Sequence, residues 1–330
     1  MLFQYFFLSL QPNSVRGRAV VARRAHNPEV VGSSPAPATK KRPVFSGLFY
    51  FPALRFYFLS FYFYPLSGLI LFLPEKNSYF CRLIIESMKI AAMVFAAGLG
   101  SRLYPLTADK PKALIEINGV TLLESAIRKI TGSGISEIVV NVHHFGDRII
   151  RFLKNHTFEA DIHISHEKEK LLDTAGGLKQ AAPFFKGCDH IVLYNVDILS
   201  SIHLGELIKK HTDSGVLASL AVRNRQTERY FIFDKESMLL CGWKNRKTGQ
   251  VTQSVPTLAP VELAFSGIHI VKREIIDLIP ANEPMSLAPL YVRLSEKHPI
   301  FGYLHQEDEW MDIGKYKEFM EKFGNGEALF

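Results

Sequence analysis

Residues 89–114 read KIAAMVFAAGLGSRLYPLTADKPKAL. The first nine residues form an apolar run that ends at Gly98, and such a run is typical of a strand buried on both faces of a parallel sheet. The glycine-rich loop that follows lets backbone N–H groups approach a bound group closely. Pro105 and Pro111 keep the rest of the stretch irregular. The segment therefore predicts a buried strand that delivers an irregular, glycine-rich loop to one edge of a sheet.

Strands and helices alternate on the C-terminal side of this loop. Short apolar runs predict strands at 137–142, 161–165 and 190–197. Amphipathic segments predict helices at 121–130 and 145–155 and a further helix that begins near 174. Alternation of this kind indicates a mostly parallel central sheet covered by helices on both faces. The predicted fold class is therefore α/β, a three-layer sandwich of the Rossmann-like type.

The pattern changes after about residue 215. Short strands joined by polar turns are followed by a strand at 264–271, helices near 273–279 and 286–297, a strand at 300–305 and a helix at 314–323. The short strands predict a small antiparallel extension of the same sheet. We expect a single domain that covers residues 88–330.

The formal net charge of +7 is confined to the first part of the chain. Residues 1–87 contain 10 Lys and Arg residues against 3 Asp and Glu residues, and the remainder contains 29 of each kind. A basic excess usually points to nucleic acid or a membrane surface, but the part that is predicted to fold is balanced, so no nucleic-acid partner is expected. Cys81, Cys188 and Cys241 have no metal-type spacing. This sparse, odd set indicates a reducing compartment, and we expect a cytoplasmic location.

The first 87 residues allow two interpretations. Residues 56–74 are mostly apolar and rich in aromatic residues, and their length is near that needed to span a bilayer. Residues 25–40, however, resemble the peptide obtained when a transfer-RNA gene is translated by mistake, and Met88 opens a well-formed strand. We therefore expect residues 1–87 to be a non-native or disordered extension produced by a gene-start error, with Met88 as the initiator. A membrane contact is expected only if residues 56–74 are a true anchor.

Two cations, Arg102 and Lys112, lie on the irregular loop. A dinucleotide-binding loop would carry a third glycine where Leu103 stands, and the pattern of a P-loop is absent. Arginine offers a planar fork to phosphate oxygens, and lysine offers a compact charge. Either cation alone fits an ordinary solvated surface residue. Together on a glycine-rich loop they favour a site for phosphate groups.

The stretch resembles the pattern G-x-G-x-R-x-x-P-x-T-x-x-x-P-K of the sugar-phosphate nucleotidylyltransferases. The matching residues are Gly98, Gly100, Arg102, Pro105, Thr107, Pro111 and Lys112. The resemblance extends over about residues 88–320 and implies the nucleotide-diphospho-sugar transferase type of α/β fold. It also implies that a nucleoside triphosphate is wrapped by Gly98, Leu99, Gly100, Ser101 and Arg102. Arg102 and Lys112 are then the catalytic residues, which stabilise charge around the α-phosphate as pyrophosphate leaves.

Two aspartates from distant segments are candidate metal ligands. Asp197 ends a predicted strand, and ligands of open α/β sheets bind at the carboxyl ends of strands, whereas Asp312 lies in the segment EWMDIGKY. Each aspartate by itself also fits a helix cap or a turn. The resemblance implies that both hold a catalytic Mg²⁺, because they match the family's strand-end N-G-D and late W-x-D-I-G patterns. Val196 replaces the usual glycine beside Asp197, and Asn195 is assigned to the nucleotide.

Two further segments are assigned through the resemblance. The segment DTAGG (173–177) matches the family's E/G-T-A-G-G/A element, which implies nucleotide contact by Gly176 and Gly177; a capped helix start is the alternative. The segment AFSGIHIV (264–271) matches the F-x-G-I strand that lines the sugar pocket. The candidate sugar-binding residues are therefore Ser266 and Gly267, with Glu262 nearby. An ordinary buried strand with a glycine bulge is the alternative there.

The resemblance implies in-line attack of a sugar 1-phosphate on the α-phosphorus of a nucleoside triphosphate, with Mg²⁺ as the cofactor. No side-chain nucleophile and base are legible in the sequence, and none is needed, because the sugar phosphate is itself an anionic nucleophile. The short, single-domain members of the family act on N-acetylmuramate 1-phosphate with UTP, on mannose 1-phosphate with GTP, or on related heptose phosphates. We favour the first pair. A catalytically silent protein that senses nucleotide sugars is the rival class, and a homo-oligomer is left open.

Overall fold

The computed structural model describes residues 88–280, 283–314 and 321. The interpretations of residues 1–87, including the apolar segment 56–74, fall outside these residues, as does nearly all of the helix expected at 314–323. Within the described residues, no helix combines the length and the apolar character needed to cross a membrane.

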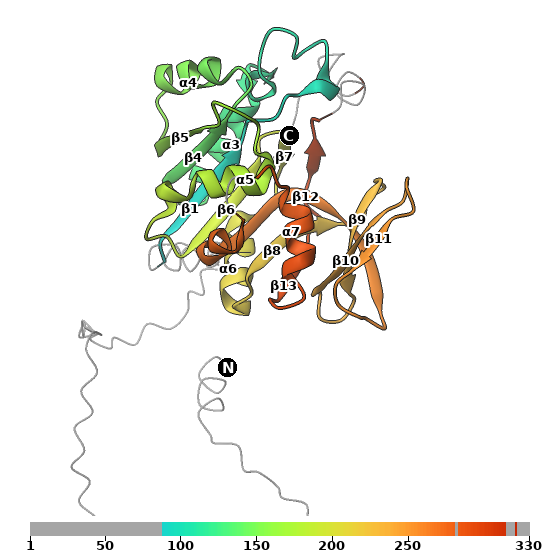
Figure 1. Cartoon of the computed structure of the whole chain (residues 1–330). Coiled ribbons are helices and arrows are strands. Elements are labelled where there is room, and N and C mark those ends of the chain that lie inside the picture. Colours follow the sequence, from blue (N-terminus) through green and yellow to red (C-terminus); the bar gives the residue numbers. More distant parts are fainter. Residues whose placement is uncertain (1–87, 281–282, 315–320, 322–330) are drawn as a thin grey trace, which may run out of the picture. The chain divides into compact units, whose positions relative to one another are not determined.

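Four parallel strands form the central part of the sheet (Figure 1). In spatial order they are β6 (His190–Asn195), β1 (Ile90–Phe95), β4 (Glu137–Val142) and β5 (Asp161–His166). β1 pairs with β6 and β4, and β4 pairs with β5, always in parallel. The apolar run at the start of the folded body accordingly forms a middle strand with five of its six residues buried. The strand predicted before the glycine-rich loop and the three strands predicted after it, at 137–142, 161–165 and 190–197, are confirmed.

Helices cover both faces of this sheet (Figure 1). They are α3 (Leu122–Thr131), α4 (Gly146–Asn155), α5 (Asp173–Gln180), α6 (Leu204–Ser214) and α7 (Leu287–Leu294). Successive side chains of a strand point to opposite faces of its sheet. Ile90, Ala92 and Val94 of β1 therefore pack in one cluster with α3, α4 and α6, whereas Ala91 and Met93 pack in a second cluster with α5 and α7. The predicted three-layer α/β sandwich is confirmed.

The long strand β12 (Pro260–Lys272) joins the parallel strands to an antiparallel extension. It runs antiparallel to β6 and also to β8 and β9. The strands of this part are β8 (Ala218–Arg223), β9 (Arg229–Asp234), β10 (Leu240–Asn245), β11 (Val251–Gln253) and β13 (Ile300–Leu304). β13 lies parallel to β8, and β9, β10 and β11 form an antiparallel ribbon. The predicted antiparallel extension is thus part of the same sheet.

Several elements escape prediction from the sequence. They include helix α6, the hairpin of β2 (Glu116–Ile117) with β3 (Val120–Thr121), and the ladder of β7 (Ile198–Ser200) with β14 (Trp310–Asp312). The helix expected at 273–279 is a 3-10 helix, Arg273–Leu278. The two-stranded ladder matters most for the site, because β14 carries Asp312 to the end of β6.

Three histidines, His211, His269 and His305, lie in the core. A ring nitrogen of each contacts a Ser or Tyr hydroxyl at 2.7 to 2.9 Å. Burial lowers the pKa of His211 and His269 to about 3, and it lowers the pKa of His305 to about 4. All three are therefore held neutral where an unfolded chain would take up protons.

We expect the folded protein to lose stability as the pH falls below 6.5, the ordinary pKa of histidine. Between that pH and about 4, the unfolded chain binds protons at these three positions and the folded chain does not. Each histidine therefore lowers the free energy of unfolding by about 1.4 kcal/mol per pH unit over this range. Above it their contribution is fully retained. Urea midpoints measured from about pH 7 to about pH 5, above the range of most carboxyl groups, check this. A midpoint that stays constant over this range would contradict the prediction.

Candidate active site

The loop after β1 folds back on itself around Gly100. The φ of Gly100 is +66°, a value that favours glycine, and a Cβ there would lie 3.0 Å from Thr107 Cγ2 and 3.2 Å from Lys112 Cβ. The Thr107 hydroxyl donates to the Gly100 carbonyl at 3.0 Å. Two short 3-10 helices, Ser101–Leu103 and Lys112–Leu114, carry the two cations of the loop. The close approach at Gly100 therefore explains how residues ten positions apart come to the same place.

Two strands far apart in the sequence bring Asp197 and Asp312 together. Asp197 follows β6, and Asp312 ends β14. β14 pairs with β7, so that Asp312 lies opposite Ile198, and the Ile313 N–H donates to the Asp197 carbonyl at 2.8 Å. Lys112 Nζ lies 2.7 Å from Asp197 Oδ2. The strand pairing thus places both carboxyl groups beside one of the predicted catalytic cations.

Gly314 lies at the centre of this group. A Cβ at Gly314 would lie 2.6 Å from Asp312 Oδ1, 3.1 Å from Arg102 Nη2 and 3.3 Å from Asp197 Oδ2. The Gly314 N–H donates to Asp312 Oδ1 at 2.7 Å. Two carboxyl groups and an arginine therefore surround Gly314 so closely that no larger residue fits there.

The surroundings raise the pKa of the Asp312 carboxyl group. Burial is the largest cause, and the nearby Asp197 carboxylate acts in the same direction. The Gly314 N–H, Arg102 and Lys112 act in the opposite direction, because each favours the ionised form. Two acidic groups thus lie close together in a place where water cannot fully solvate them.

Such a pair of carboxylates fits a small divalent cation. Mg²⁺ takes oxygen ligands and is usually bound by one or two carboxylates together with phosphate oxygens and water. Among the described residues, no group of three or more His, Cys, Asp or Glu side chains could hold a metal ion without such help. The donor set of Asp197 and Asp312 therefore suits a metal that arrives with a phosphorylated ligand.

Two adjoining clefts open beside this group, with volumes of about 320 Å³ and about 300 Å³. They share Gly98, Arg102, Lys112 and Leu171. The larger one is also lined by Phe95, Ala97, Glu167, Asp173, Thr174, Asn195 and Asp197. The smaller one is also lined by Leu99, Gly100, Ser101 and Gly314. The glycine-rich loop and Asn195, which the sequence assigns to the nucleotide, all border this space.

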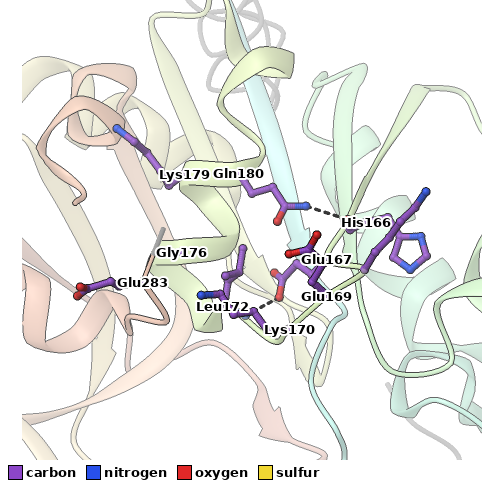
Figure 2. Close-up of a pocket in the computed structure, with 10 residues that line it drawn as sticks. His166, Glu167, Glu169, Lys170, Leu172, Gly176, Lys179, Gln180 and Glu283 are labelled. Atoms are coloured by element: carbon purple, nitrogen blue, oxygen red, sulfur yellow. Dashed lines mark hydrogen bonds between the residues drawn. The ribbon is translucent and has the colours of Figure 1, made fainter. Parts of the chain in front are cut away.

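Gly176 and Gly177 face protein atoms and line neither cleft. A Cβ at Gly176 would lie 2.8 Å from Leu172 Cβ and 3.0 Å from the Glu283 carbonyl oxygen, and a Cβ at Gly177 would lie 2.7 Å from Glu167 Oε1. Gly176 borders a separate cavity of about 600 Å³ (Figure 2). Close packing of α5 thus accounts for both glycines, and their contact with a nucleotide stays a prediction. The alternative of a side-chain cap also differs from the structure, because Leu172 is the N-cap residue.

The candidate sugar-binding residues are dispersed. Glu262 forms ion pairs with Lys244 at 2.6 Å and Arg246 at 2.9 Å, and none of the three candidates lines the two clefts. Ser266 is fully buried, and its hydroxyl contacts a core histidine. Gly267 has a φ of +78°, and a Cβ there would lie 3.0 Å from Asn195 Nδ2. Of the three, only Gly267 thus comes close to a residue of the clefts.

Several residues that line the clefts escaped the sequence reasoning, among them Glu167, Leu171 and Gly314. Gly314 is the glycine of the W-x-D-I-G match, so the pattern itself contained its signal. Leu171 stands two residues before the DTAGG segment. Glu167 has no local signal, because its place depends on contacts with another strand.

Comparisons with known proteins identify the family of the chain. Residues 91–327 match the family model described as nucleotidyl transferase. An N-acetylmuramate alpha-1-phosphate uridylyltransferase of Caulobacter vibrioides is 31% identical over 230 residues, which are 68% of this chain and 91% of that protein. A UTP–glucose-1-phosphate uridylyltransferase of Synechocystis is 27% identical over 248 residues, which are 70% of this chain but 61% of that longer protein.

Solved structures share the fold at low sequence identity. HddC from Yersinia pseudotuberculosis, complexed with GMP-PN, has a TM-score of 0.56 at 16% identity, and the match covers 73% of this chain and 100% of that chain. A putative glucose-1-phosphate thymidylyltransferase from Bacillus anthracis, in complex with a sucrose, has a TM-score of 0.58 at 16% identity, over 70% and 93% of the two chains. The match to the family model covers well over half of the sequence. The chain therefore belongs to the nucleotidyl transferase family, as a sugar-1-phosphate nucleotidylyltransferase.

Proposed function

We propose that the chain transfers a nucleotidyl group from a nucleoside triphosphate to a sugar 1-phosphate, by direct displacement at the two clefts. The observation that carries this proposal is the meeting of Arg102, Lys112, Asp197 and Asp312 around Gly314. Both cations and Asp197 border the larger cleft, where the phosphates would lie. The products are a nucleoside diphosphate sugar and pyrophosphate.

The reaction needs no nucleophile from the protein. A phosphate oxygen of the sugar 1-phosphate attacks the α-phosphorus, the new P–O bond forms, and the bond to the leaving pyrophosphate breaks. Arg102 and Lys112 would offset the negative charge that gathers around the α-phosphate and the leaving group. Catalysis of this kind depends on positioning and on preorganised charge.

Asp197 and Asp312 are the residues that would hold Mg²⁺. When bound, the ion would neutralise phosphate charge and polarise the phosphoryl oxygens. The ion pair with Lys112 keeps the Asp197 carboxylate oriented. The raised pKa of Asp312 fits the same role, because a divalent cation relieves the repulsion between two close carboxylates.

We favour UTP and N-acetylmuramate 1-phosphate as the substrates. This preference is supported by the uridylyltransferase of Caulobacter vibrioides, since the match covers 91% of that protein. GTP with mannose 1-phosphate is the alternative, supported by guanylyltransferases that are 23% to 26% identical over about 62% of their own length. Cytoplasmic location and homo-oligomer formation stay predictions.

Pyrophosphate release is the measurement that tests this proposal. UTP, GTP, dTTP, ATP and CTP are each combined with N-acetylmuramate, mannose, glucose and heptose 1-phosphates in the presence of Mg²⁺. We expect the fastest release with one favoured pair, UTP with N-acetylmuramate 1-phosphate. Release with every other pair should be at least about tenfold slower, since loss of one specific contact has about that effect. Release that needs no sugar phosphate, or that is unaffected by EDTA, would contradict the mechanism. Binding of nucleotide sugars without any release would favour the sensor instead.

A further inference from the structure

Glu167 is a buried acid outside the catalytic group. It directly follows β5, and its exposed fraction is 2%. Its backbone N–H donates to the Val142 carbonyl at 2.8 Å, which prolongs the pairing of β5 with β4. Acidic side chains are rarely buried this deeply without a specific partner. The contacts of the carboxylate therefore need an explanation.

Two neighbours on different elements hold the two carboxylate oxygens. The Asn141 side-chain amide, at the end of β4, donates to Oε1. The Leu172 backbone N–H donates to Oε2 at 2.7 Å (Figure 2). Glu167 thus connects the end of β4 to the loop that precedes α5.

The same loop is anchored on its other side. The Leu172 carbonyl accepts from the Met285 N–H at 2.9 Å, and the Ala175 N–H donates to the Met285 carbonyl at 2.8 Å. The Leu287 N–H donates to Thr174 Oγ1 at 2.8 Å. Between these attachments, Leu171, Asp173 and Thr174 line the larger cleft. The end of the loop and the first turn of α5 therefore form one wall of that cleft, and Glu167 attaches the loop on the side of β4 and β5.

Gly177 provides a second, independent observation. A Cβ at Gly177 would lie 2.7 Å from Glu167 Oε1 and 2.9 Å from Asn141 Nδ2, closer than a Cβ atom approaches such atoms in proteins. The helix therefore carries glycine at the point where it faces the Glu167 and Asn141 pair. Any larger residue would displace the carboxylate from its two donors.

We propose that Glu167 is a positioning residue, which braces the loop before α5 so that the backbone of residues 171–174 forms the nucleotide wall of the cleft. In naming a nucleotide as the ligand, this inference rests on the proposed function. Glu167 acts through Leu172, and Gly177 leaves the space that the brace needs.

Two substitutions of Glu167 and one matched control test the brace. Glu167→Ala removes both hydrogen bonds, and Glu167→Gln leaves a single acceptor oxygen for the two donors, Asn141 and Leu172. Glu169→Gln removes the same charge from an exposed position of the same loop. Each Glu167 variant should raise the KM for the nucleoside triphosphate by about tenfold or more, since a hydrogen bond to a charged group has about that effect. The KM for the sugar 1-phosphate should stay unchanged, and the control should match the wild type.

Amide hydrogen exchange of residues 168–174 gives a readout that needs no substrate. Exchange in this segment should quicken by about tenfold in Glu167→Ala, because the Leu172 N–H loses its acceptor, and it should be unchanged in Glu169→Gln. Unchanged exchange together with a raised KM would overturn the proposal in favour of direct contact between Glu167 and the nucleotide. If the amide exchange and the KM for the nucleoside triphosphate were both unchanged, the proposal would be overturned outright. If no substrate pair is turned over at all, the proposed function fails, while the exchange result still decides whether the brace exists.

Gly177→Ala adds a test of the coupling. Alone, it should quicken the same exchange, because the methyl group displaces the carboxylate. In the Glu167→Ala background the added methyl group should have little further effect, since the atom that it would strike is gone. Additive effects of the two substitutions would contradict the brace.

Discussion

Replacing Asp312 by asparagine is expected to lower turnover by about a thousandfold or more, because loss of a metal-ligating charge removes several kcal/mol of transition-state stabilisation. The same change should leave the protein folded and make it more stable in the absence of Mg²⁺. The pKa of Asp312 is raised by burial and by Asp197, so the ionised carboxylate at neutral pH destabilises the folded state. Asparagine keeps an oxygen that can accept from the Gly314 N–H and removes the repulsion.

Asp197→Asn is expected to have the opposite effect on stability from Asp312→Asn. It should also abolish turnover, but it should destabilise the protein, because Asp197 is paired with Lys112 at 2.7 Å and the substitution leaves that ammonium group without its carboxylate. Pyrophosphate release and the urea midpoint, both measured for the two variants, separate these effects. Near-normal turnover in either variant would refute its role in the site.

The central sheet and the glycine-rich loop were predictable because their signals are local. The alternation of β1 side chains between two helical layers follows from a short apolar run. The loop pattern contains Arg102 and Lys112 within one stretch of sequence. Asp197 and Asp312 could be paired only through the resemblance to a family, since their meeting depends on the ladder of β7 with β14. Two strands of three residues leave no periodic signal of their own.

Residues whose positions depend on tertiary contacts were the ones that could not be placed from the sequence. Ser266 was expected to line a sugar pocket, but the register of β12 with β8 shifts between Phe265 and His269, and such an irregularity changes where a strand's side chains point. Its hydroxyl therefore contacts His305 in the core. Gly177 faces Glu167, and its contact with a nucleotide stays a prediction. A glycine in a sequence does not say which neighbour needs the space.

Gly314→Ala is expected to lower turnover by about a hundredfold or more without changing any charge, since misplacement of reacting groups by about 1 Å has an effect of this size. The added methyl carbon would lie 2.6 Å from Asp312 Oδ1 and 3.1 Å from Arg102 Nη2. Both atoms belong to side chains that can move, so the fold should survive while the spacing between the carboxylates widens. The concentration of Mg²⁺ needed for half-maximal turnover should rise along with the loss of kcat.

Gly98→Ala is the matched control for the Gly314 variant. Gly98 also borders both clefts, but a Cβ there meets no atom within 4 Å. Its methyl group would project only into space assigned to the triphosphate, so the KM for the nucleotide should rise while the Mg²⁺ dependence stays at the wild-type value. Circular dichroism and the urea midpoint establish that both variants are folded. If Gly314→Ala retained the wild-type Mg²⁺ dependence and kcat, the carboxylates would not have to converge at Gly314 for the reaction to proceed.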